Sequence, residues 1–401
     1  MAMRKDVAYM LVIAVVAVLL RAGAGMVQPM VFDDSRDYHV LAQRVLNGDS
    51  YEVNELQASR MPGYAVFLAG VYGTLGESIY AVTLTQAVLG GGIVALTFLL
   101  AQPMGPRIAL VAAALAAVDP LSIGFSAAVL TETLYTLLLM GGLLVAMWLL
   151  KGGGYRGWVV LGLVWAVGVY VRASALWCIV PVGAWVVFMT FGGERKVLVK
   201  QVVGVVIAMG VMMLTLSPWM ARNVRLFGEG WKFYQLTTLE GISLYESVYK
   251  DATGGPRQDK IVLPEEMRAM GEAERDREWR RRAWAEIKAE PLRVAGLAVV
   301  KIGRTWSPWL NAEGFRQPLL RIGMAAFYVP LFLLAVFALW KVRMPLAVVG
   351  LILVPIVYFT AVHAVFLGSV RYRVPLMPLV CVLAAVSAVW LTDKLRQGKR
   401  V

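Results

Sequence analysis

The sequence predicts an all-α protein that crosses a membrane about ten times, with amphipathic helices and a small helical segment on its outer face. Hydrophobic residues make up 59% of the 401 residues and charged residues only 16%, which is too apolar for a soluble domain. The mean hydropathy is +0.67. Apolar runs of bilayer-spanning length recur along the chain, and basic residues gather in alternate connecting segments.

Ten apolar runs are long enough, or nearly long enough, to be membrane helices, because crossing the hydrocarbon core takes about 20 apolar residues. The third and the fifth run are short, and we expect them to be broken or tilted. In chain order the runs occupy residues 7–27, 79–101, 107–118, 127–150, 157–173, 174–192, 198–219, 319–340, 345–366 and 374–392.

The first run also has features of a signal peptide. Arg4 and Lys5 precede it, and Ala22-Gly23-Ala24 has the small-residue pattern of a cleavage site. We expect an uncleaved helix, because an inner N-terminus places 14 basic and only three acidic residues in the short inner segments. Both termini are then cytoplasmic, and this orientation explains the net charge of +13 without a nucleic-acid partner.

The segment 293–310 is apolar enough to suggest a further span, but it contains Lys301 and Arg304. If it crossed, the basic C-terminal tail would move outside. We therefore expect a helix that lies in the outer interface, with Trp306 and Trp309 at headgroup depth.

This topology divides the chain into three parts. Residues 1–219 form an N-terminal transmembrane module, expected to be catalytic, whose first outer loop spans 28–78. Residues 220–318 form an extracytoplasmic segment with the interfacial helix. Residues 319–401 supply the C-terminal membrane helices and a basic cytoplasmic tail.

Three carboxylates, Asp33, Asp34 and Asp37, directly follow the first apolar run. One interpretation is a solvated loop in which Asp33 or Asp34 caps a short helix whose apolar face includes Tyr38. The other is a catalytic base at the membrane surface, because ionisable residues beside hydrocarbon are costly and often mark functional sites.

Further polar residues fall at the outer ends of other runs, so the topology brings them to the same face. They are Arg60, Tyr64, Asp119, Glu132, Arg172, Arg222, His363, Arg371, Tyr372 and Arg373.

Structural alternatives exist for several of these residues. We expect Asp119 to cap a turn and His363 to be a packed histidine, while Glu132 could complement a helix dipole. Arg21 and Arg172 could snorkel to the surface, which we favour for Arg21. Cys178 and Cys381 lie in separate apolar runs, where packing is the default interpretation.

Positive charge is unusual in a short outer loop, so Arg371 and Arg373 indicate an anion site. Arginine binds phosphate in a bidentate manner and keeps its charge, which suits a lipid phosphate at the interface. The sequence contains no Walker loop, dinucleotide glycine motif, HExxH or GxSxG, so soluble nucleotide chemistry is unsupported.

Taken together, these motifs resemble bacterial integral-membrane C-type glycosyltransferases, most closely the protein mannosyltransferase and aminoarabinose transferase (ArnT-like) superfamily. The resemblance runs in order from residue 7 to about 392. The motifs that carry it are Asp34-Ser35-x-x-Tyr38-His39-x-Leu41-Ala42, Arg60-x-Pro62-Gly63-Tyr64, Thr131-Glu132, Pro218-Trp219-x-x-Arg222-Asn223 and Arg371-Tyr372-Arg373-x-Pro375.

The resemblance implies an enzyme of the bacterial inner membrane that moves a sugar from a polyprenyl-phosphate carrier to an acceptor hydroxyl on the extracytoplasmic side. It implies that Asp34 is the catalytic acid of the first outer loop and that Glu132 is a second acid, where aspartate would be the family's residue. Asp33 is a further catalytic candidate. We expect Asp34 to act as the base in a single inverting displacement.

Two groups of residues are expected around this base. Candidates for binding the donor phosphate are Arg60, Arg222, Arg371 and Arg373. Candidates for binding the substrate are Tyr38, Tyr64, Arg172, His363 and Tyr372.

No cofactor is expected to be obligatory, although a divalent ion could bind through Asp33, Asp34 or Glu132. The expected partners are the lipid-linked sugar, membrane lipids, and a lipid, glycan or protein acceptor. The main alternative is a transporter or flippase of lipid-linked sugars, which would more readily show paired repeats. A non-catalytic scaffold subunit would leave the Asp34, Arg60 and Arg371 motifs without a use.

Overall fold

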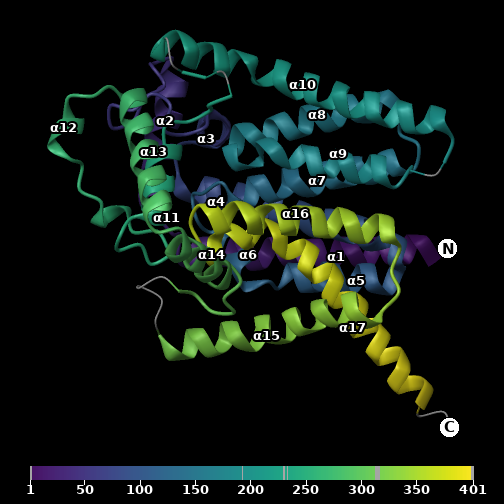
Figure 1. The fold of residues 1–401 in the computed structure, drawn as a ribbon. Coiled ribbons are helices and arrows are strands. Elements are labelled where there is room, and N and C mark those ends of the chain that lie inside the picture. Colours follow the sequence, from purple (N-terminus) through teal and green to yellow (C-terminus); the bar gives the residue numbers. More distant parts are fainter. Residues whose placement is uncertain (1, 192, 229–230, 233, 312–316, 399–401) are drawn as a thin grey trace.

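The computed structural model describes residues 2–191, 193–228, 231–232, 234–311 and 317–398. In this part of the chain the structure consists of helices and two isolated β-bridges, with no strand. The long helices lie side by side in one bundle, and short helices gather at one of its ends (Figure 1). The expectation of an all-α polytopic membrane protein is confirmed.

The first half of the bundle is formed by ten α-helices and two short 3-10 helices. They are α1 (Ala2–Val27), α2 (Asp33–Asn47), α3 (Pro62–Leu75), α4 (Ile79–Ala101), η1 (Gln102–Met104), α5 (Pro106–Ala117), α6 (Pro120–Ser126), α7 (Glu132–Leu150), α8 (Gly154–Val171), η2 (Ala173–Cys178), α9 (Ile179–Phe188) and α10 (Arg195–Phe227).

The second half contains the short helices at one end of the bundle and the last three long helices. They are α11 (Glu240–Val248), η3 (Gln258–Lys260), α12 (Glu265–Arg268), α13 (Glu272–Ala289), α14 (Pro291–Thr305), α15 (Pro318–Lys341), α16 (Leu346–Val365), η5 (Val370–Leu376) and α17 (Met377–Gly398).

Eight helices in the described residues are long and apolar enough to cross a membrane, and a bent pair, α5 and α6, could supply a ninth. The expected third run is thus one leg of a broken span, with an angle of 52° between its legs. The expected sixth run forms η2 and the short α9, and the expected fifth run is the complete 18-residue helix α8. The predicted count of about ten was therefore close, and the differences lie at these breaks.

The break between α5 and α6 is encoded at Asp119-Pro120. Proline cannot continue a helix, and here it takes the first position of α6, where a missing N–H costs nothing. The Asp119 carboxylate caps α6 by accepting a hydrogen bond from the Ser122 N–H at 3.0 Å. The expected capping role of Asp119 is confirmed.

Arg21 corrects the expectation of a snorkelling side chain. It is only 2% exposed, and its guanidinium donates to the carbonyls of Ala116 at 3.0 Å and Ala117 at 2.9 Å. These carbonyls belong to the last turn of α5, which has no intrahelical donors for them. Burial is therefore more favourable here than extension to the surface.

Helix α14 is not among the candidate spans, in agreement with the expectation for residues 293–310. Its apolar face is turned away from the protein: Leu292 and Val299 are 87% and 70% exposed, whereas the charged Lys301 is buried. Its location in the outer interface stays a prediction, as does the division of the chain at residues 219 and 318.

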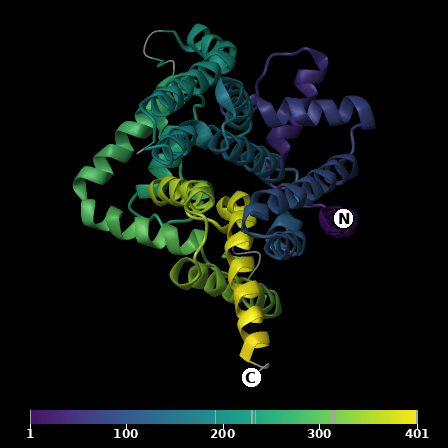
Figure 2. The same ribbon diagram turned by 90° about the vertical axis from the view of Figure 1, so that its right-hand side faces the viewer.

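Both termini lie at one end of the bundle, and α11 to α14 lie at the opposite end (Figure 1). The last turns of α17 extend away from the other helices in both views (Figures 1 and 2). The bundle is held by close packing of α1 on α4, α8 on α10, and α17 on both α5 and α15. The chain is a multi-pass membrane protein with its irregular segments concentrated at one end.

Candidate active site

Asp34 lies in the first turn of α2, at the end of the bundle that carries α11 to α14. The helix begins after the extended residue Phe32, so neither Asp33 nor Asp34 is the N-cap that the sequence suggested. The Ser35 hydroxyl accepts the Phe32 N–H at 3.0 Å, while Tyr38 and Leu41 bury the apolar face as expected. The helix dipole favours a carboxylate at this position.

Two arginines from distant parts of the chain hold the two oxygens of Asp34. Arg60 Nη2 lies 2.6 Å from Oδ1, and Arg371 Nη1 lies 2.7 Å from Oδ2. Arg60 also binds Asp37 Oδ2 at 2.8 Å. The carboxylate of Asp34 is therefore fixed between the segment that precedes α3 and the η5 turn.

Arg371 continues this network to Glu132 at the start of α7. Its Nε–H donates to Glu132 Oε1, which also lies 3.4 Å from Arg172 Nη1. The Glu132 side chain is fully buried, and its Oε2 has no hydrogen-bond partner among the described residues. Three carboxylates and three guanidinium groups thus form one continuous set of ion pairs, which we call the outer network: Asp34, Asp37, Arg60, Glu132, Arg172 and Arg371.

The outer network is open to solvent at one side and closed at the other. The side chains of Asp34, Arg60 and Arg371 are 25%, 20% and 24% exposed, whereas that of Glu132 is 0% exposed. A molecule approaching from the outside would meet Asp34 and its two arginines first.

The arginines set the protonation state of Asp34. Burial by itself raises the pKa of Asp34, but the charges and hydrogen bonds of Arg371 and Arg60 outweigh burial and hold that pKa below its usual value. Burial likewise lowers the pKa of Arg60, but the charge of Asp34 together with the charge and hydrogen bond of Asp37 and the nearby Tyr38 outweighs burial and raises that pKa. Asp34 is therefore ionised and able to accept a proton.

Tyr38 and Tyr64 form the apolar support behind Arg60. Their rings meet edge to face at 4.9 Å, and the Arg60 guanidinium lies 5.7 Å from the Tyr38 ring centre. Tyr64 is completely buried, and its hydroxyl donates to Gln86 Oε1 at 2.9 Å. Both tyrosines thus position the site, and Tyr64 is not reachable by a ligand in this arrangement.

His363 and Tyr372 lie beside the Arg172 end of the network. Their rings are stacked with centres 4.1 Å apart, and the Arg172 guanidinium lies 5.7 Å from the Tyr372 ring centre. His363 is 7% exposed, so it is packed as the sequence suggested. Arg172 is equally part of the interior, since its side chain is only 13% exposed.

A close approach of two helices brings Arg60 and Arg172 to the same site. Gly63, at the start of α3, lies against the backbone at the end of α8, where an added Cβ would come within 2.7 Å of the Tyr170 carbonyl. Any side chain at Gly63 would therefore separate the segments that carry the two arginines.

Three of the predicted charged residues, Asp33, Arg222 and Arg373, lie outside the outer network. Asp33 is exposed, and within the part of the chain that the structure describes it makes no ion pair. Arg222 donates to the Tyr51 carbonyl at 3.0 Å and lies over the Trp219 ring at 4.6 Å. Arg373 is fully buried and donates to the Thr305 carbonyl at 3.1 Å and to the Ser307 carbonyl. The structure therefore brings together Asp34, Glu132, Arg60, Arg371 and Arg172 but not these three.

Asp37 was present in the acidic stretch but was not singled out by sequence reasoning. Its spacing of three residues from Asp34 is the signal that could have found it, because such residues share one helix face. Among the described residues, no group of three or more His, Cys, Asp or Glu side chains could hold a metal ion.

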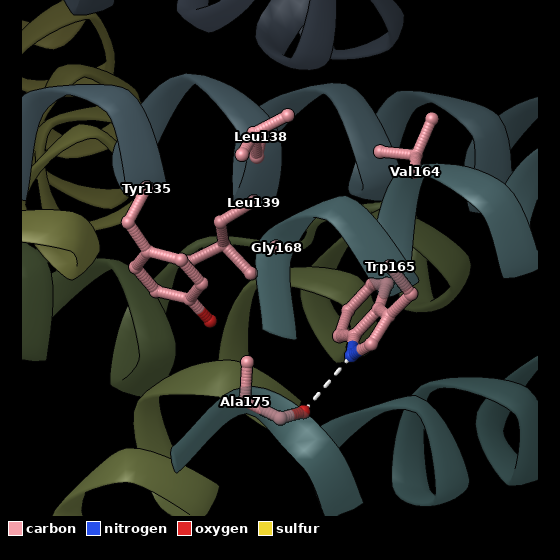
Figure 3. A pocket seen from close by; sticks show the side chains of 7 residues that line it. All are labelled: Tyr135, Leu138, Leu139, Val164, Trp165, Gly168 and Ala175. Carbon is pink, nitrogen blue, oxygen red and sulfur yellow. Dashed lines mark hydrogen bonds between the residues drawn. The ribbon is translucent and has the colours of Figure 1, made fainter. Parts of the chain in front are cut away.

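A small cavity lies between α7, α8 and η2, and Tyr135, one turn after Glu132 on α7, contributes to its wall. It has a volume of about 10 Å³ and is lined by Tyr135, Leu138, Leu139, Val164, Trp165, Gly168 and Ala175 (Figure 3). The Trp165 Nε1–H donates to the Ala175 carbonyl at 3.0 Å, and the Tyr135 hydroxyl points into the space between these side chains (Figure 3). Such a volume holds about one water molecule, so a substrate does not bind here.

Comparison with known families gives one match. The family model of dolichyl-phosphate-mannose-protein mannosyltransferase matches residues 59–221, a range that includes Arg60, Glu132 and Arg172. No curated protein matches the sequence.

Among solved structures, the oligosaccharyltransferase of Archaeoglobus fulgidus is similar in fold. Its apo form is 13% identical with a TM-score of 0.60, and the alignment covers 98% of this chain and 51% of that chain. The same protein tethered to an acceptor peptide containing the NVT sequon is 14% identical with a TM-score of 0.59, covering 97% and 50%. The chain thus spans about half the length of that oligosaccharyltransferase, and at this identity the likeness concerns the fold alone.

The family match over residues 59–221 confirms that the chain resembles the protein mannosyltransferase superfamily, and the solved structures agree with it in fold.

Proposed function

We propose that the protein transfers a sugar from a polyprenyl-phosphate donor to an acceptor hydroxyl, with inversion at the anomeric carbon and Asp34 as the general base. One observation carries this proposal above the others: the Asp34 carboxylate is held between Arg60 and Arg371 at a solvent-accessible position. The proposed base is therefore in direct contact with two groups that can bind the donor phosphate.

The reaction requires few groups from the protein. The acceptor oxygen attacks the anomeric carbon, the bond from that carbon to the phosphate oxygen breaks, and the hydroxyl proton passes to Asp34. The departing polyprenyl phosphate carries one more negative charge than it had in the donor. Arg60 and Arg371 stabilise this added charge.

The ion pairs supply a way to couple donor binding to the strength of the base. A donor phosphate that binds Arg60 and Arg371 competes with Asp34 for the same N–H groups, because each arginine holds one Asp34 oxygen. As the arginines turn toward phosphate, the pKa of Asp34 rises toward its usual value. Asp34 thus becomes a better proton acceptor once the donor is in place.

Glu132 and Arg172 hold Arg371 from the closed side of the network. Because Glu132 Oε1 accepts from Arg371 Nε, the Nη groups of Arg371 stay directed toward Asp34. The stacked rings of His363 and Tyr372 extend this support, with Arg172 over Tyr372. Glu132 is therefore a second acid that positions an arginine, and Asp34 is the acid that receives the proton.

Arginine and not a metal ion is proposed to neutralise the phosphate. Guanidinium groups already occupy both oxygens of Asp34, the carboxylate that would otherwise bind a divalent ion. No obligatory cofactor is proposed. The acceptor is a lipid, glycan or protein hydroxyl, and the peptide acceptor of the fold relative supports a protein acceptor as the first class to test.

We also propose a location in a bacterial inner membrane, with cytoplasmic termini and an extracytoplasmic site. The support for this orientation is twofold. The ends of the chain lie opposite α11 to α14 (Figure 1), and the predicted topology places 14 basic and three acidic residues in the short segments on the side of the termini.

The proposal is tested by reconstituting the purified protein in lipid with labelled polyprenyl-phosphate sugars and an acceptor mixture, with and without a chelator. Asp34→Asn should lower turnover by about 10²–10⁴-fold, the usual contribution of a general base. Asp33→Asn is the matched control, because Asp33 is the exposed neighbour outside the network, and it should retain wild-type turnover.

Three results would contradict the proposal in different ways. Equal turnover of Asp34→Asn and the wild type would move the base to another acid. Binding of every donor without turnover in the wild type would favour the transporter. Loss of all turnover in the chelator would add a divalent ion to the site.

A further inference from the structure

The loop that carries Arg60 is held by a residue outside the membrane bundle. The carboxylate of Glu272, the first residue of α13, accepts the N–H of Gln57 at 2.6 Å and the N–H of Ala58 at 3.0 Å. More than 200 residues separate Glu272 from this loop. Only one residue, Ser59, lies between Ala58 and Arg60, whose guanidinium binds Asp34.

Thr238 completes the clamp. Its hydroxyl donates to Glu272 Oε1, and its N–H donates to the Ala58 carbonyl at 3.0 Å. Ala58 is thus held at both its N–H and its carbonyl, and it is completely buried. Two hydrogen bonds to a charged carboxylate are stronger than the neutral bonds of an ordinary loop.

Without such a clamp the loop would have other conformations available. Asn54 and Glu55 have positive φ angles of 52° and 63°, a region that non-glycine residues adopt at a cost. The surrounding structure must therefore determine this conformation. Arg222 contributes at the other end of the loop, where it donates to the Tyr51 carbonyl.

Helix α13 is itself firmly placed, so the clamp has a rigid base. Asp276, one turn after Glu272, accepts the Gly241 N–H at 2.6 Å and pairs with Arg280 at 2.6 Å. An added Cβ on Gly241 would come within 2.0 Å of the Asp276 carbonyl oxygen, so α11 and α13 are in direct backbone contact. Trp279 is buried on the same face of α13.

We propose that Glu272 is a positioning residue that sets the Arg60 guanidinium for phosphate by clamping the backbone of Gln57 and Ala58. The α11–α13 segment thereby controls how tightly the donor binds. This inference rests on the proposed function, since it assigns the purpose of the clamp to the same phosphate site.

The test is a double-mutant cycle on binding of polyprenyl phosphate, the carrier without its sugar, to the full-length protein in lipid. Glu272→Gln keeps the size of the side chain but replaces one acceptor oxygen with an amide that cannot accept the backbone N–H. We expect the dissociation constant to rise about tenfold, the effect of losing one charge-assisted hydrogen bond. In an Arg60→Ala background the same change should have less than a twofold effect.

Turnover separates positioning from general damage. Glu272→Gln should raise KM for the donor about tenfold and change kcat less than about threefold, because the clamp acts through phosphate binding. Thr238→Val, which removes one hydroxyl, should give a smaller rise in KM. The matched control is Glu274→Gln, because Glu274 is exposed on the same turn and, among the described residues, accepts the N–H of Gly271, the cap of its own helix, and no other.

Amide hydrogen exchange at Gln57 and Ala58 reports directly whether the clamp is open, because Glu272 accepts both of these N–H groups. Faster exchange in Glu272→Gln together with the expected loss of binding supports the inference. Wild-type affinity in Glu272→Gln, or an equal tenfold loss with and without Arg60, would overturn it while the enzyme remained active. A wild-type protein that neither binds nor turns over any polyprenyl-phosphate sugar would instead overturn the proposed function, and the positioning role with it.

Discussion

Two clusters of arginine and acid lie toward the end of the bundle that carries α11 to α14, and they differ in what the arginines bind. In the outer network, Arg60 and Arg371 bind carboxylate oxygens and remain 20% and 24% exposed. In the second cluster, Arg21 and Arg373 bind backbone carbonyls and are 2% and 0% exposed.

The second cluster is organised around Asp119, where the chain breaks between α5 and α6. The Tyr328 hydroxyl donates to Asp119 Oδ1 and accepts the Leu121 N–H at 2.9 Å, while the Arg373 guanidinium lies 4.7 Å from the Tyr328 ring centre. Asp119 is 1% exposed. These groups are closed to a ligand, and we call them the inner cluster: Arg21, Asp119, Tyr328 and Arg373.

The comparison teaches how to separate functional from structural arginines in a membrane protein. A carboxylate partner can be exchanged for a phosphate, because both offer anionic oxygens to the same N–H groups. A carbonyl partner at a helix end has no such replacement, and losing the arginine leaves it unsatisfied. The solvent exposure of the arginine then decides whether a phosphate can reach it and replace the carboxylate.

Among the arginines of the two clusters, Arg371 should show the largest effect, because Arg371→Gln breaks the outer network at its centre. The variant removes the contacts to both Asp34 and Glu132, and kcat/KM should fall about 10²–10³-fold because transition-state charge loses one of its stabilising groups. Steady-state turnover measures the loss. Arg36→Gln, an exposed arginine on α2, is the control, and an equal loss in both variants would refute the special role of Arg371.

Substitutions in the inner cluster should lower the free energy of unfolding and leave the kinetic constants of the folded enzyme unchanged. Arg21→Met leaves the Ala116 and Ala117 carbonyls without donors and should lower the free energy of unfolding by about 2–4 kcal/mol. Thermal unfolding in detergent measures this change, and the folded fraction should keep its KM. Arg107→Met removes a 70% exposed arginine and should cost under about 0.5 kcal/mol. A raised donor KM in Arg21→Met would assign the inner cluster a part in binding.

The smallest expected effect is a difference between two pH profiles. In the free enzyme the pKa of Asp34 is lowered, so its ionised form persists as pH falls through the usual titration range of an aspartate, and kcat/KM stays level over that range. In the donor complex the arginines contact phosphate and the pKa of Asp34 rises. The acid limb of kcat should therefore lie at higher pH than that of kcat/KM. Coincident limbs would mean that donor binding leaves the Asp34 ion pairs intact.

Sequence reasoning predicted that Asp34, Glu132, Arg60 and Arg371 would lie at the same face, and the structure brings them together. Each of them lies at the end of an apolar run or in a connecting segment on the same side, so alternation of the spans brings them to one face whatever the details of packing. Reasoning from sequence failed for Arg21, because the carbonyl acceptors that bury it exist only after α5 ends and bends.

Arg373 shows that closeness in sequence did not predict closeness in the folded site. It stands two residues from Arg371, and both were expected at the phosphate, but the two lie on a 3-10 turn of about three residues, which sends them to different sides. Glu272 illustrates a different limit, since one glutamate in a charged solvated helix carries no mark that distinguishes it from Glu274.

The sequence by itself determined the membrane helices, the end of the bundle at which the charges gather, and the types of group available for chemistry there. Hydropathy and charge fix these features because each depends on composition over a stretch of chain. The tertiary structure alone decided which arginine meets which carboxylate. Ion pairs such as Asp34–Arg371, 337 residues apart, depend on the rotation and bending of each helix, and hydropathy does not encode those angles.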